Sequence, residues 1–403
     1  MIELPEITPQ RLAVKLKTAA ERMVRKEHPW VFETGIVKLS KEGEAGDLAI
    51  IYDQKKNKFL AIGLYDPFSP IRIKVLSKKP APINEDWFRE RIAEAFAKRS
   101  SLLETDTNSY RFIYGENDDL PGFVADVYAH VLVVKLYSFA WLPYLKIMLP
   151  LLLTQSQCNT AVLRLSRNLQ QRPQHLHGLE DGQLIFGQLD SPEVIFREHG
   201  LRFSANVISG HKTGYFLDHR HNRKRVGELA KGKKVLDIFA YAGGFSVHAL
   251  SGNAKQVISL DISKQALEMA KKNMALNFAE ARHQTLAVDA FEGMESLIHQ
   301  GRKFGLVVVD PPSFAKSEKE ISGALHSYSR LAKLAIQLVE QNGILLLASC
   351  SSRVKAEDFF ELMTQELKQS GRSYRELERS THDVDHPIGF PEGAYLKSIY
   401  FKL

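Results

Sequence analysis

The sequence is poor in cysteine and has no unbroken apolar run long enough to cross a membrane. Two cysteines in 403 residues exclude a disulfide framework and a cysteine-rich zinc site, and they fit a reducing compartment. The most apolar stretch, residues 130–153, is interrupted by Lys135, Pro143, Lys146 and Pro150, whereas a membrane span needs roughly 20 nearly uncharged residues. The first residues carry acids and lack the apolar centre of a secretory signal. We therefore expect a cytoplasmic protein with no membrane partner and no metal site.

What the chain does have is an ordinary globular composition with a moderate excess of basic residues. Hydrophobic residues make up 44% and charged residues 25%, as in soluble domains. The formal net charge of +7 favours contact with a polyanion such as nucleic acid. The length fits two or three domains, each with its own core.

Three segments differ in pattern. Residues 8–80 alternate short apolar runs with turn signals, which predicts a small β-barrel or sandwich. A proline-rich linker follows, and residues 85–190 mix strand-like runs with helical spacing, which indicates an α+β domain. Residues 195–403 alternate strands with amphipathic helices. This last pattern predicts a mostly parallel, doubly wound α/β sheet of the Rossmann type, with helices on both faces.

The run LVVVDPPSF, residues 306–314, ends a buried strand at an acid and two prolines. Because proline fixes φ and has no N–H, the strand tip is stiff and offers carbonyl acceptors without donors. We interpret Asp310, Pro311, Pro312 and Phe314 as a slot for the edge and face of a planar base. A strand-terminating turn without a ligand is an equal alternative on these residues alone.

Acids recur at the tips of neighbouring strands. Asp237 lies near the end of the first strand, before a turn that contains Gly243, and Asp261, Asp289 and Asp310 end later strands. Open α/β sheets bind ligands at this carboxyl edge, and an acid about 20 residues after the glycine turn can hold ribose hydroxyls. The turn matches neither common phosphate-binding pattern. Each acid alone could simply cap the next helix.

The order VLDIFAYAGGF, SLDIS, VDAF and VVVDPPSF resembles the class I S-adenosylmethionine-dependent methyltransferases. More narrowly, His211–Arg220, the Asp-Pro-Pro-Ser-Phe turn and Ser349–Ser351 look like the PUA-domain-bearing methyltransferases of large-subunit ribosomal RNA. His28–Phe32 matches the PUA domain of that family and Tyr110–Asp126 its central domain. Asp385–Pro387 and Pro391–Lys397 match its C-terminal strands. The family makes 5-methylcytosine in 23S rRNA.

This resemblance implies S-adenosyl-L-methionine as the cofactor, 23S rRNA as the partner, and a defined set of site residues. Asp261 would take the ribose hydroxyls, while Asp289 and Phe291 would lie at the adenine. Asp237, at which many members carry Asn, would lie at the methionine end. The full set of residues expected at the cofactor is Phe216, Asp218, Arg220, Asp237, Phe239, Tyr241, Gly243, Asp261, Ile262, Asp289, Ala290, Phe291 and Asp310.

Cys350 is the candidate nucleophile. Carbon-5 of cytosine is a poor nucleophile, but a thiolate that adds to carbon-6 makes carbon-5 reactive and then departs. Cys350 follows the apolar strand 343–348 and lies among serines, whereas Cys158 has no such setting. Asp310 is the second catalytic candidate, and Lys316 would join Pro311, Pro312 and Phe314 at the substrate. The ordinary role of a free cysteine is that of a small core residue.

Basic and aromatic residues occur together near the N-terminus, which suits structured RNA. They are Arg11, Lys15, Lys17, Arg22, Arg25, Lys26, Trp30 and Phe32. A solvated basic face over core aromatics is the ordinary alternative for each of them. The sequence leaves a homodimer open.

Two other functions remain open. Asp-Pro-Pro with an aromatic residue also suits the exocyclic amine of guanine or adenine, so a nitrogen methyltransferase is the nearest alternative. An RNA-binding or ribosome-assembly factor without catalysis is the other. Substitution of Cys350 distinguishes the nitrogen methyltransferase from a carbon-5 methyltransferase, because an amine methylase needs no thiol. Binding of S-adenosylmethionine distinguishes an enzyme from an RNA-binding factor without catalysis.

Overall fold

The computed structural model describes residues 3–403, which form two compact units. The first contains the chain up to Arg197, Ala205–Leu217 and Val384–Phe390, and the second contains Glu198–Ser204, Asp218–Asp383 and Pro391–Leu403. The segments 8–80 and 85–190 both lie in the first unit, so their division into two domains stays a prediction. Among the described residues, none of the helices combines the length and apolar character that a membrane crossing needs.

The N-terminal part of the first unit is a six-stranded sheet in the order β2-β6-β5-β4-β1-β3, antiparallel except between β1 and β4. This confirms the closely spaced strands predicted for residues 8–80. Residues 30–39 form two strands around a 3₁₀ turn, and the apolar pattern did not indicate α1. The elements are β1 (Arg11–Leu16), α1 (Thr18–Arg25), β2 (Trp30–Phe32), η1 (Glu33–Gly35), β3 (Ile36–Leu39), β4 (Leu48–Tyr52), β5 (Phe59–Tyr65) and β6 (Ile71–Ser77).

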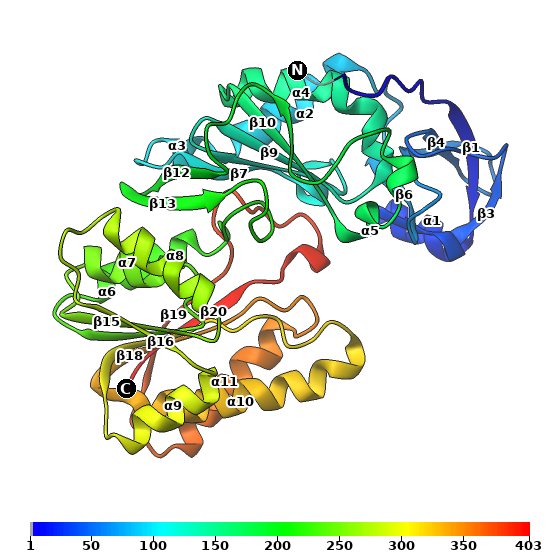
Figure 1. Ribbon diagram of the computed structural model, residues 1–403. Helices are drawn as coiled ribbons and strands as arrows, with labels where there is room; N and C mark the ends of the chain where they lie inside the picture. Colours follow the sequence, from blue (N-terminus) through cyan, green and yellow to red (C-terminus); the bar gives the residue numbers. More distant parts are fainter. Residues whose placement is uncertain (1–2) are drawn as a thin grey trace. The chain divides into compact units, whose positions relative to one another are not determined.

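The central part is a five-stranded sheet in the order β11-β10-β9-β8-β7 (Figure 1). Residues 139–156 form η3 followed by α4, and the side chain of Asn84 caps α2 by accepting the N–H of Trp87 at 3.1 Å. The elements are α2 (Glu85–Ala97), α3 (Ser100–Leu103), β7 (Ser109–Tyr114), η2 (Gly115–Asp118), β8 (Phe123–Tyr128), β9 (Val131–Leu136), η3 (Phe139–Tyr144), α4 (Leu145–Ser156), β10 (Thr160–Leu165), α5 (Arg167–Gln170), η4 (Pro173–His175) and β11 (Gln183–Phe186).

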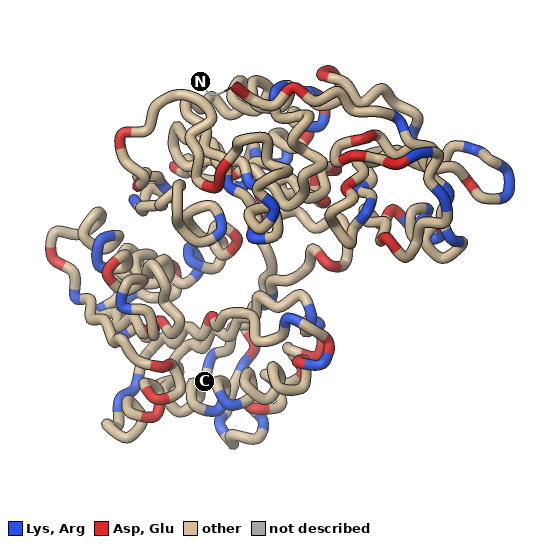
Figure 2. The backbone as a smooth tube through the Cα atoms, turned by 45° about the vertical axis from the view of Figure 1, so that its right-hand side comes forward, with Lys and Arg blue, Asp and Glu red and all other residues tan. Residues whose placement is uncertain are grey.

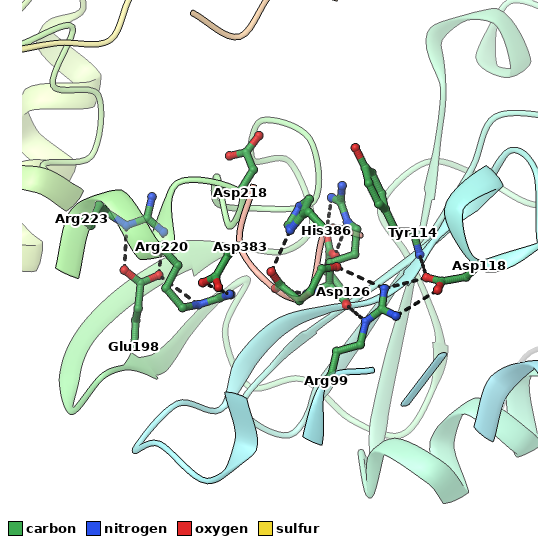
Figure 3. A network of polar contacts seen from close by, with 12 residues as sticks. Arg99, Tyr114, Asp118, Asp126, Glu198, Asp218, Arg220, Arg223, Asp383 and His386 are labelled. Carbon is green, nitrogen blue, oxygen red and sulfur yellow. Dashed lines mark hydrogen bonds and ion pairs between the residues drawn. The ribbon is translucent and has the colours of Figure 1, made fainter. Parts of the chain in front are cut away.

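The buried side chain of Arg99 helps to hold the segment Val384–Phe390 in the first unit (Figure 3). Arg99 is fully buried, and its five N–H groups reach both carboxylate oxygens of Asp118 and the carbonyls of Ala95, Arg111 and Asp385. The expectation that Asp385–Pro387 lies among the C-terminal strands is wrong, because this segment is a loop held in the first unit.

The second unit is built on a seven-stranded sheet in the order β16-β15-β14-β17-β18-β20-β19, in which β20 alone runs opposite to the other six strands. The mostly parallel doubly wound sheet is thus confirmed, and of Pro391–Lys397 only Lys397 lies in a strand. β12 (Glu193–Glu198) and β13 (Leu201–Asn206) form a separate two-stranded sheet, of which only Glu198 and residues 201–204 belong to this unit. The other elements of the second unit are α6 (Arg220–Leu229), β14 (Lys234–Ile238), α7 (Gly244–Ser251), β15 (Gln256–Asp261), α8 (Lys264–Ala275), β16 (His283–Ala287), α9 (Ala290–His299), β17 (Phe304–Val309), η5 (Glu318–Glu320), α10 (Ile321–Leu338), β18 (Val339–Ser349), α11 (Ala356–Gln369), β19 (Arg375–Ser380), η6 (Pro391–Gly393) and β20 (Lys397–Lys402).

Helices cover both faces of this sheet, with α6, α7 and α8 on one and α9, α10 and α11 on the other (Figure 1). The valine run of β17 serves both faces, because successive side chains of a strand point to opposite sides. Leu306 and Val308 pack into the core that includes Phe245 of α7, while Val307 and Val309 pack into the opposite core. A continuous apolar run is therefore what a doubly covered strand requires.

Candidate functional site

The candidate residues gather where the parallel strands of the second unit end. Asp261 ends β15, Asp289 follows β16 by two residues, Asp310 directly follows β17, and Cys350 directly follows β18. The strands pair in parallel, so these ends lie along one edge of the sheet. This is the edge at which open α/β sheets bind ligands.

The turn after β14 has an unusual backbone. Phe239, Tyr241 and Gly243 all have positive φ, at 63°, 47° and 73°, a conformation that is uncommon for residues other than glycine. A Cβ at Gly243 would lie 2.8 Å from the Cβ of Ala270 in α8, so only glycine fits there. The turn therefore brings its backbone close to α8 and leads into the N-terminus of α7.

Asp261 is oriented by two backbone N–H groups. Its Oδ2 accepts from Tyr241 at 2.9 Å, and its Oδ1 accepts from Ser263 at 2.8 Å. Each oxygen keeps a lone pair for a further donor such as a ribose hydroxyl. Ile262, the next residue, is 72% exposed, which leaves a large apolar side chain beside this carboxylate to cover a flat ring.

Asp289 and Phe291 are both engaged within the unit. Asp289 caps α9, since its Oδ1 accepts from the N–H of Phe291 at 2.9 Å and of Glu292 at 3.3 Å. Ala290 is buried, and the guanidinium carbon of Arg330 lies 4.3 Å from the ring centre of half-buried Phe291. The capping role foreseen as an alternative for Asp289 is present.

Asp237 lies beneath the turn, not at its surface. It is fully buried, and its Oδ2 accepts from the N–H (3.1 Å) and hydroxyl (2.6 Å) of Ser246 in α7. Its Oδ1 has no hydrogen-bond partner among the described residues. Burial, with the negative charges of Asp310 and Asp261, raises the pKa of Asp237 to about 7 against the opposing bonds from Ser246.

Asp310 has a partner that sequence reasoning missed. The Nε2 atom of His219 lies 3.1 Å from Asp310 Oδ1, and the imidazole is 5% exposed. On the other side of the ring, Nδ1 lies 3.2 Å from the amide nitrogen of Asn222. His219 stands between Asp218 and Arg220, which were both predicted to be site residues, and its place in that motif was the only available signal.

Cys350 and the Asp-Pro-Pro turn are in direct contact. The thiol of Cys350, which is half-buried, lies 3.5 Å from the carbonyl oxygen of Pro311, and the hydroxyl of Ser351 lies 3.5 Å from the carbonyl of Ala315. Cys158, in contrast, is 7% exposed in the core of the first unit. The two catalytic candidates, Asp310 and Cys350, therefore belong to adjoining strand ends.

The remaining residues of the predicted base slot differ in their surroundings. Pro311 is buried and Pro312 is exposed. The ring of Phe314 is half-buried and packs edge-on against Tyr328, with ring centres 5.1 Å apart. Lys316 is exposed, and its backbone N–H donates to Glu320. Phe314 is therefore partly engaged by the core.

Asp218 and Arg220 are buried in the second unit, whereas Phe216 lies in the first unit, where the ammonium of Lys212 is 4.4 Å from its ring centre. Asp218 accepts the hydroxyl of Tyr395 at 2.7 Å. Arg220 is fully buried and pairs with Asp383 at 3.1 Å, as Figure 3 shows. Its guanidinium thus orders the loop that carries Asp383.

Glu198 is a buried carboxylate close to Arg220 and Arg223, and the sequence did not indicate it. These three residues, with His248 and Asp383, form a buried charge cluster. Arg223 donates to the two oxygens of Glu198 at 2.7 and 2.6 Å (Figure 3). Nε2 of His248 lies 2.9 Å from Glu198 Oε1. Burial opposes ionisation of Glu198, but the neighbouring Arg223 outweighs it and holds the pKa of Glu198 well below its usual range. The cluster fixes the start of α6, directly after Asp218 and His219.

Comparison with known proteins agrees with these features. Residues 119–402 match the model of an S-adenosylmethionine-dependent methyltransferase family, and residues 14–78 match that of a PUA-like domain. A solved structure described as a SAM-dependent methyltransferase from Streptococcus mutans superposes with a TM-score of 0.81 at 18% identity, covering 97% of this chain and all of that one. Another, a methyltransferase described as complexed with SAH, gives 0.82 at 19% identity and covers 98% and 100%. At 18–19% identity these two solved structures support the fold of this chain and nothing more specific.

The fold and these matches define a methyltransferase with a PUA-like domain, and its methyl donor is S-adenosyl-L-methionine. A ribosomal RNA large subunit methyltransferase of Deinococcus radiodurans is 44% identical over 99% of both chains. A ribosomal RNA large subunit methyltransferase I of Tolumonas auensis is 36% identical over 96% of this chain and 98% of its own. The chain belongs to the family of the ribosomal RNA large subunit methyltransferases.

The residues of the carboxyl edge fit this cofactor. Asp261 has lone pairs to which ribose hydroxyls could donate, and Ile262 offers an exposed apolar side chain. The unpartnered Oδ1 of Asp237 is a buried acceptor under the glycine turn. Gly243 keeps that turn free of a side chain. Three acids, Asp237, Asp261 and Asp310, also suit a ligand that carries positive charge.

Proposed function

We propose that this protein methylates carbon-5 of a cytosine in 23S ribosomal RNA of the large subunit, with Cys350 as the nucleophile. The observation that carries this proposal is the 3.5 Å contact between the thiol of Cys350 and the carbonyl of Pro311. It puts a thiol beside the rigid turn that follows Asp310. The names of the two relatives from D. radiodurans and T. auensis supply large-subunit rRNA as the substrate class.

In the proposed mechanism, the Cys350 thiolate adds to carbon-6 of the base, so an S–C bond forms and the electron pair of the ring double bond moves toward carbon-5. When bound, S-adenosylmethionine would supply an electrophilic methyl group. Carbon-5 would take up this group as the methyl–sulfur bond breaks, and the neutral thioether S-adenosylhomocysteine would leave. Loss of the proton from carbon-5 then restores the double bond as the C–S bond to Cys350 breaks.

Asp310 has the charge and position to steady the base during these steps. An ionised carboxylate can accept the exocyclic amine of cytosine, and a protonated one can donate to ring nitrogen-3. The contact with His219 restricts the orientation of Asp310. The carbonyl of Pro311, the residue after Asp310, contacts the thiol of Cys350, so the thiol adjoins the proposed base slot.

RNA binding is proposed for the N-terminal sheet. Lysine and arginine occur in both units, interspersed with acids, so charge alone does not locate the interface (Figure 2). Around α1, however, Lys17, Arg22 and Lys26 are exposed, and Phe32 is 47% exposed. Of the other basic residues expected there, Lys15 is bonded to Asn57 at 2.6 Å, which reduces its availability for phosphate.

The test is to incubate the protein with labelled S-adenosylmethionine and unmodified large-subunit rRNA, digest the RNA and identify the labelled nucleoside. We expect 5-methylcytidine, and a labelled purine would refute the proposal. Cys350→Ala should lose methylation by at least about a thousandfold, since it removes the nucleophile. Cys158→Ala is the matched control and should keep the activity of the unaltered protein.

Covalent capture of the base gives an independent check. RNA that carries 5-fluorocytosine at the target cannot lose a proton from carbon-5, so the adduct with Cys350 should persist and survive denaturing electrophoresis. No adduct should form with Cys350→Ala. Full methylation by Cys350→Ala would instead favour methylation of a nitrogen, for which Asp310 and the two prolines are also suitable.

A further inference from the structure

Lys397 is a buried cation beside the proposed nucleophile. It is the first residue of β20 and pairs across the strands with Ser349, which directly precedes Cys350. It is 1% exposed. The site residues predicted from the sequence did not include it, because β20 is antiparallel and the register that brings it to Cys350 is a property of the fold.

The ammonium of Lys397 is surrounded by backbone carbonyls. It donates to Ser351, to Val354 at 2.5 Å and to Tyr395 at 3.3 Å, so its three N–H groups each have an acceptor. Ser351 and Val354 belong to the turn that follows Cys350. The side chain therefore joins this turn to the segment before β20, and the geometry of the Cys350 turn depends on it.

These acceptors are dipoles and do not neutralise the charge. A buried ammonium is usually paired with a carboxylate, because an isolated charge in the interior is costly. Among residues 3–403, the ion pairs within 4.0 Å do not include one to Lys397. The exposed Glu357 of α11 and Cys350 are the two groups whose negative charge would favour the protonated ammonium.

We infer that Lys397 is a positioning residue that holds the turn carrying Cys350 and whose charge favours the thiolate. Asp310 and Tyr328 are two further titratable groups near this turn. Asp310 contributes negative charge from the end of β17, and Tyr328 of α10, bonded to Ser349 at 2.9 Å, is a neutral phenol. The positive charge of Lys397 offsets the negative charge of Asp310.

The titration of Lys397 is consistent with this role near neutral pH. Burial lowers the pKa of Lys397 to about 8, and the negative charges of Cys350 and Glu357 oppose this. The ammonium is therefore mostly protonated at pH 7, where a thiolate needs it. Above pH 8 the charge is progressively lost.

The test measures the acidity of Cys350 by the pH dependence of its alkylation with iodoacetamide, in a Cys158→Ser background in which it is the only thiol. We expect a midpoint below the ordinary cysteine value of about 8.5. Lys397→Met should raise this midpoint by about one pH unit, the effect of removing one nearby charge. Lys397→Arg should keep it low, and Lys402→Met, on the same strand, is the control for changes in β20.

An unchanged midpoint in Lys397→Met, or an equal rise in Lys397→Arg, would overturn the inference. If Lys397→Met does not fold, the protein that keeps Lys397 provides the test. An alkylation midpoint of Cys350 of about 8.5 or above in that protein would also overturn the inference. The inference rests on the proposed role of Cys350, but the two fail separately. Suppose that the alkylation midpoint is low and depends on Lys397, but that Cys350→Ala still methylates fully. The proposed mechanism would then be refuted, while the effect of Lys397 on the acidity of the thiol would stand.

Discussion

Asp237 offers the clearest test of the electrostatics of this site. It is fully buried, and its pKa is about 7 in the folded protein, compared with about 3.9 in an unfolded chain. Folding therefore takes up a proton between these two pH values. The stability that the protonated carboxyl provides is fully present below about pH 4 and is lost as pH rises through 7.

The substitution Asp237→Asn removes the ionisable group and keeps its shape. The amide oxygen can still accept from Ser246, so the bonds at 2.6 and 3.1 Å are retained. A shift of about 3 pKa units at about 1.4 kcal/mol each predicts that Asp237→Asn is more stable than the native protein by about 4 kcal/mol at pH 8. The difference should fall to about 1–2 kcal/mol at pH 5 and vanish below about pH 4.

The measurement must report on the second unit alone. The three tryptophans, Trp30, Trp87 and Trp141, all lie in the first unit, so intrinsic fluorescence does not follow Asp237. Hydrogen exchange of peptides from β14 and β15 gives the free energy of opening at each pH. Asp289→Asn is the control and should change it by less than about 0.5 kcal/mol, because Asn and Asp cap helices equally well. A pH-independent difference, or a less stable Asp237→Asn at pH 8, would show that the reasoning is wrong.

Three further predictions concern other parts of the molecule. Ile262→Ser should weaken binding of S-adenosylmethionine in calorimetry by about tenfold and leave stability unchanged. It removes an exposed apolar surface whose burial by the cofactor would contribute about 1–2 kcal/mol. An affinity equal to that of the native protein would exclude Ile262 from the cofactor site. Glu198→Gln should destabilise the second unit by about 3–5 kcal/mol at pH 7, because Arg223 would be buried without its carboxylate. This loss of stability should shrink below about pH 4, where the carboxyl of the unfolded chain is protonated. Urea unfolding that shows no loss of stability would contradict this prediction. Arg99→Lys should cost about 3 kcal/mol in tryptophan-monitored unfolding, because one ammonium cannot reach the five acceptors of Arg99, whereas exposed Arg89→Lys should have almost no effect.

Much of the second unit could be predicted from apolar patterns, because buried parallel strands need apolar residues on both faces. The runs that end at Asp261 and Asp310 marked two strand ends correctly, and parallel pairing put them at one edge. The contact between Cys350 and Pro311 follows from the adjacency of β17 and β18. Strand order of this kind is favoured by the right-handed crossover rule.

Side-chain direction could not be predicted in the same way. The burial of Asp237 depends on Ser246, which lies in the next helix, and the pairing of His219 with Asp310 depends on where α6 begins. The segment Asp385–Pro387 was misjudged for a related reason. Its residues match the C-terminal strands of the family, but Arg99 and Arg111 of the first unit bind the backbone and carboxylate of Asp385 with hydrogen bonds that local pattern does not reveal.

The charges at the carboxyl edge also link cofactor binding to pH. Asp237, Asp261 and Asp310 repel one another, and this repulsion contributes to the raised pKa of Asp237. A sulfonium cation at this edge would favour the ionised form, so binding of S-adenosylmethionine should release a proton near neutral pH and tighten as pH rises through 7. S-adenosylhomocysteine lacks the sulfonium charge and should show a weaker dependence. Calorimetry in buffers of different ionisation enthalpy measures the released proton, and Asp237→Asn should abolish most of it; an unchanged proton release in that variant would assign the linkage to another group.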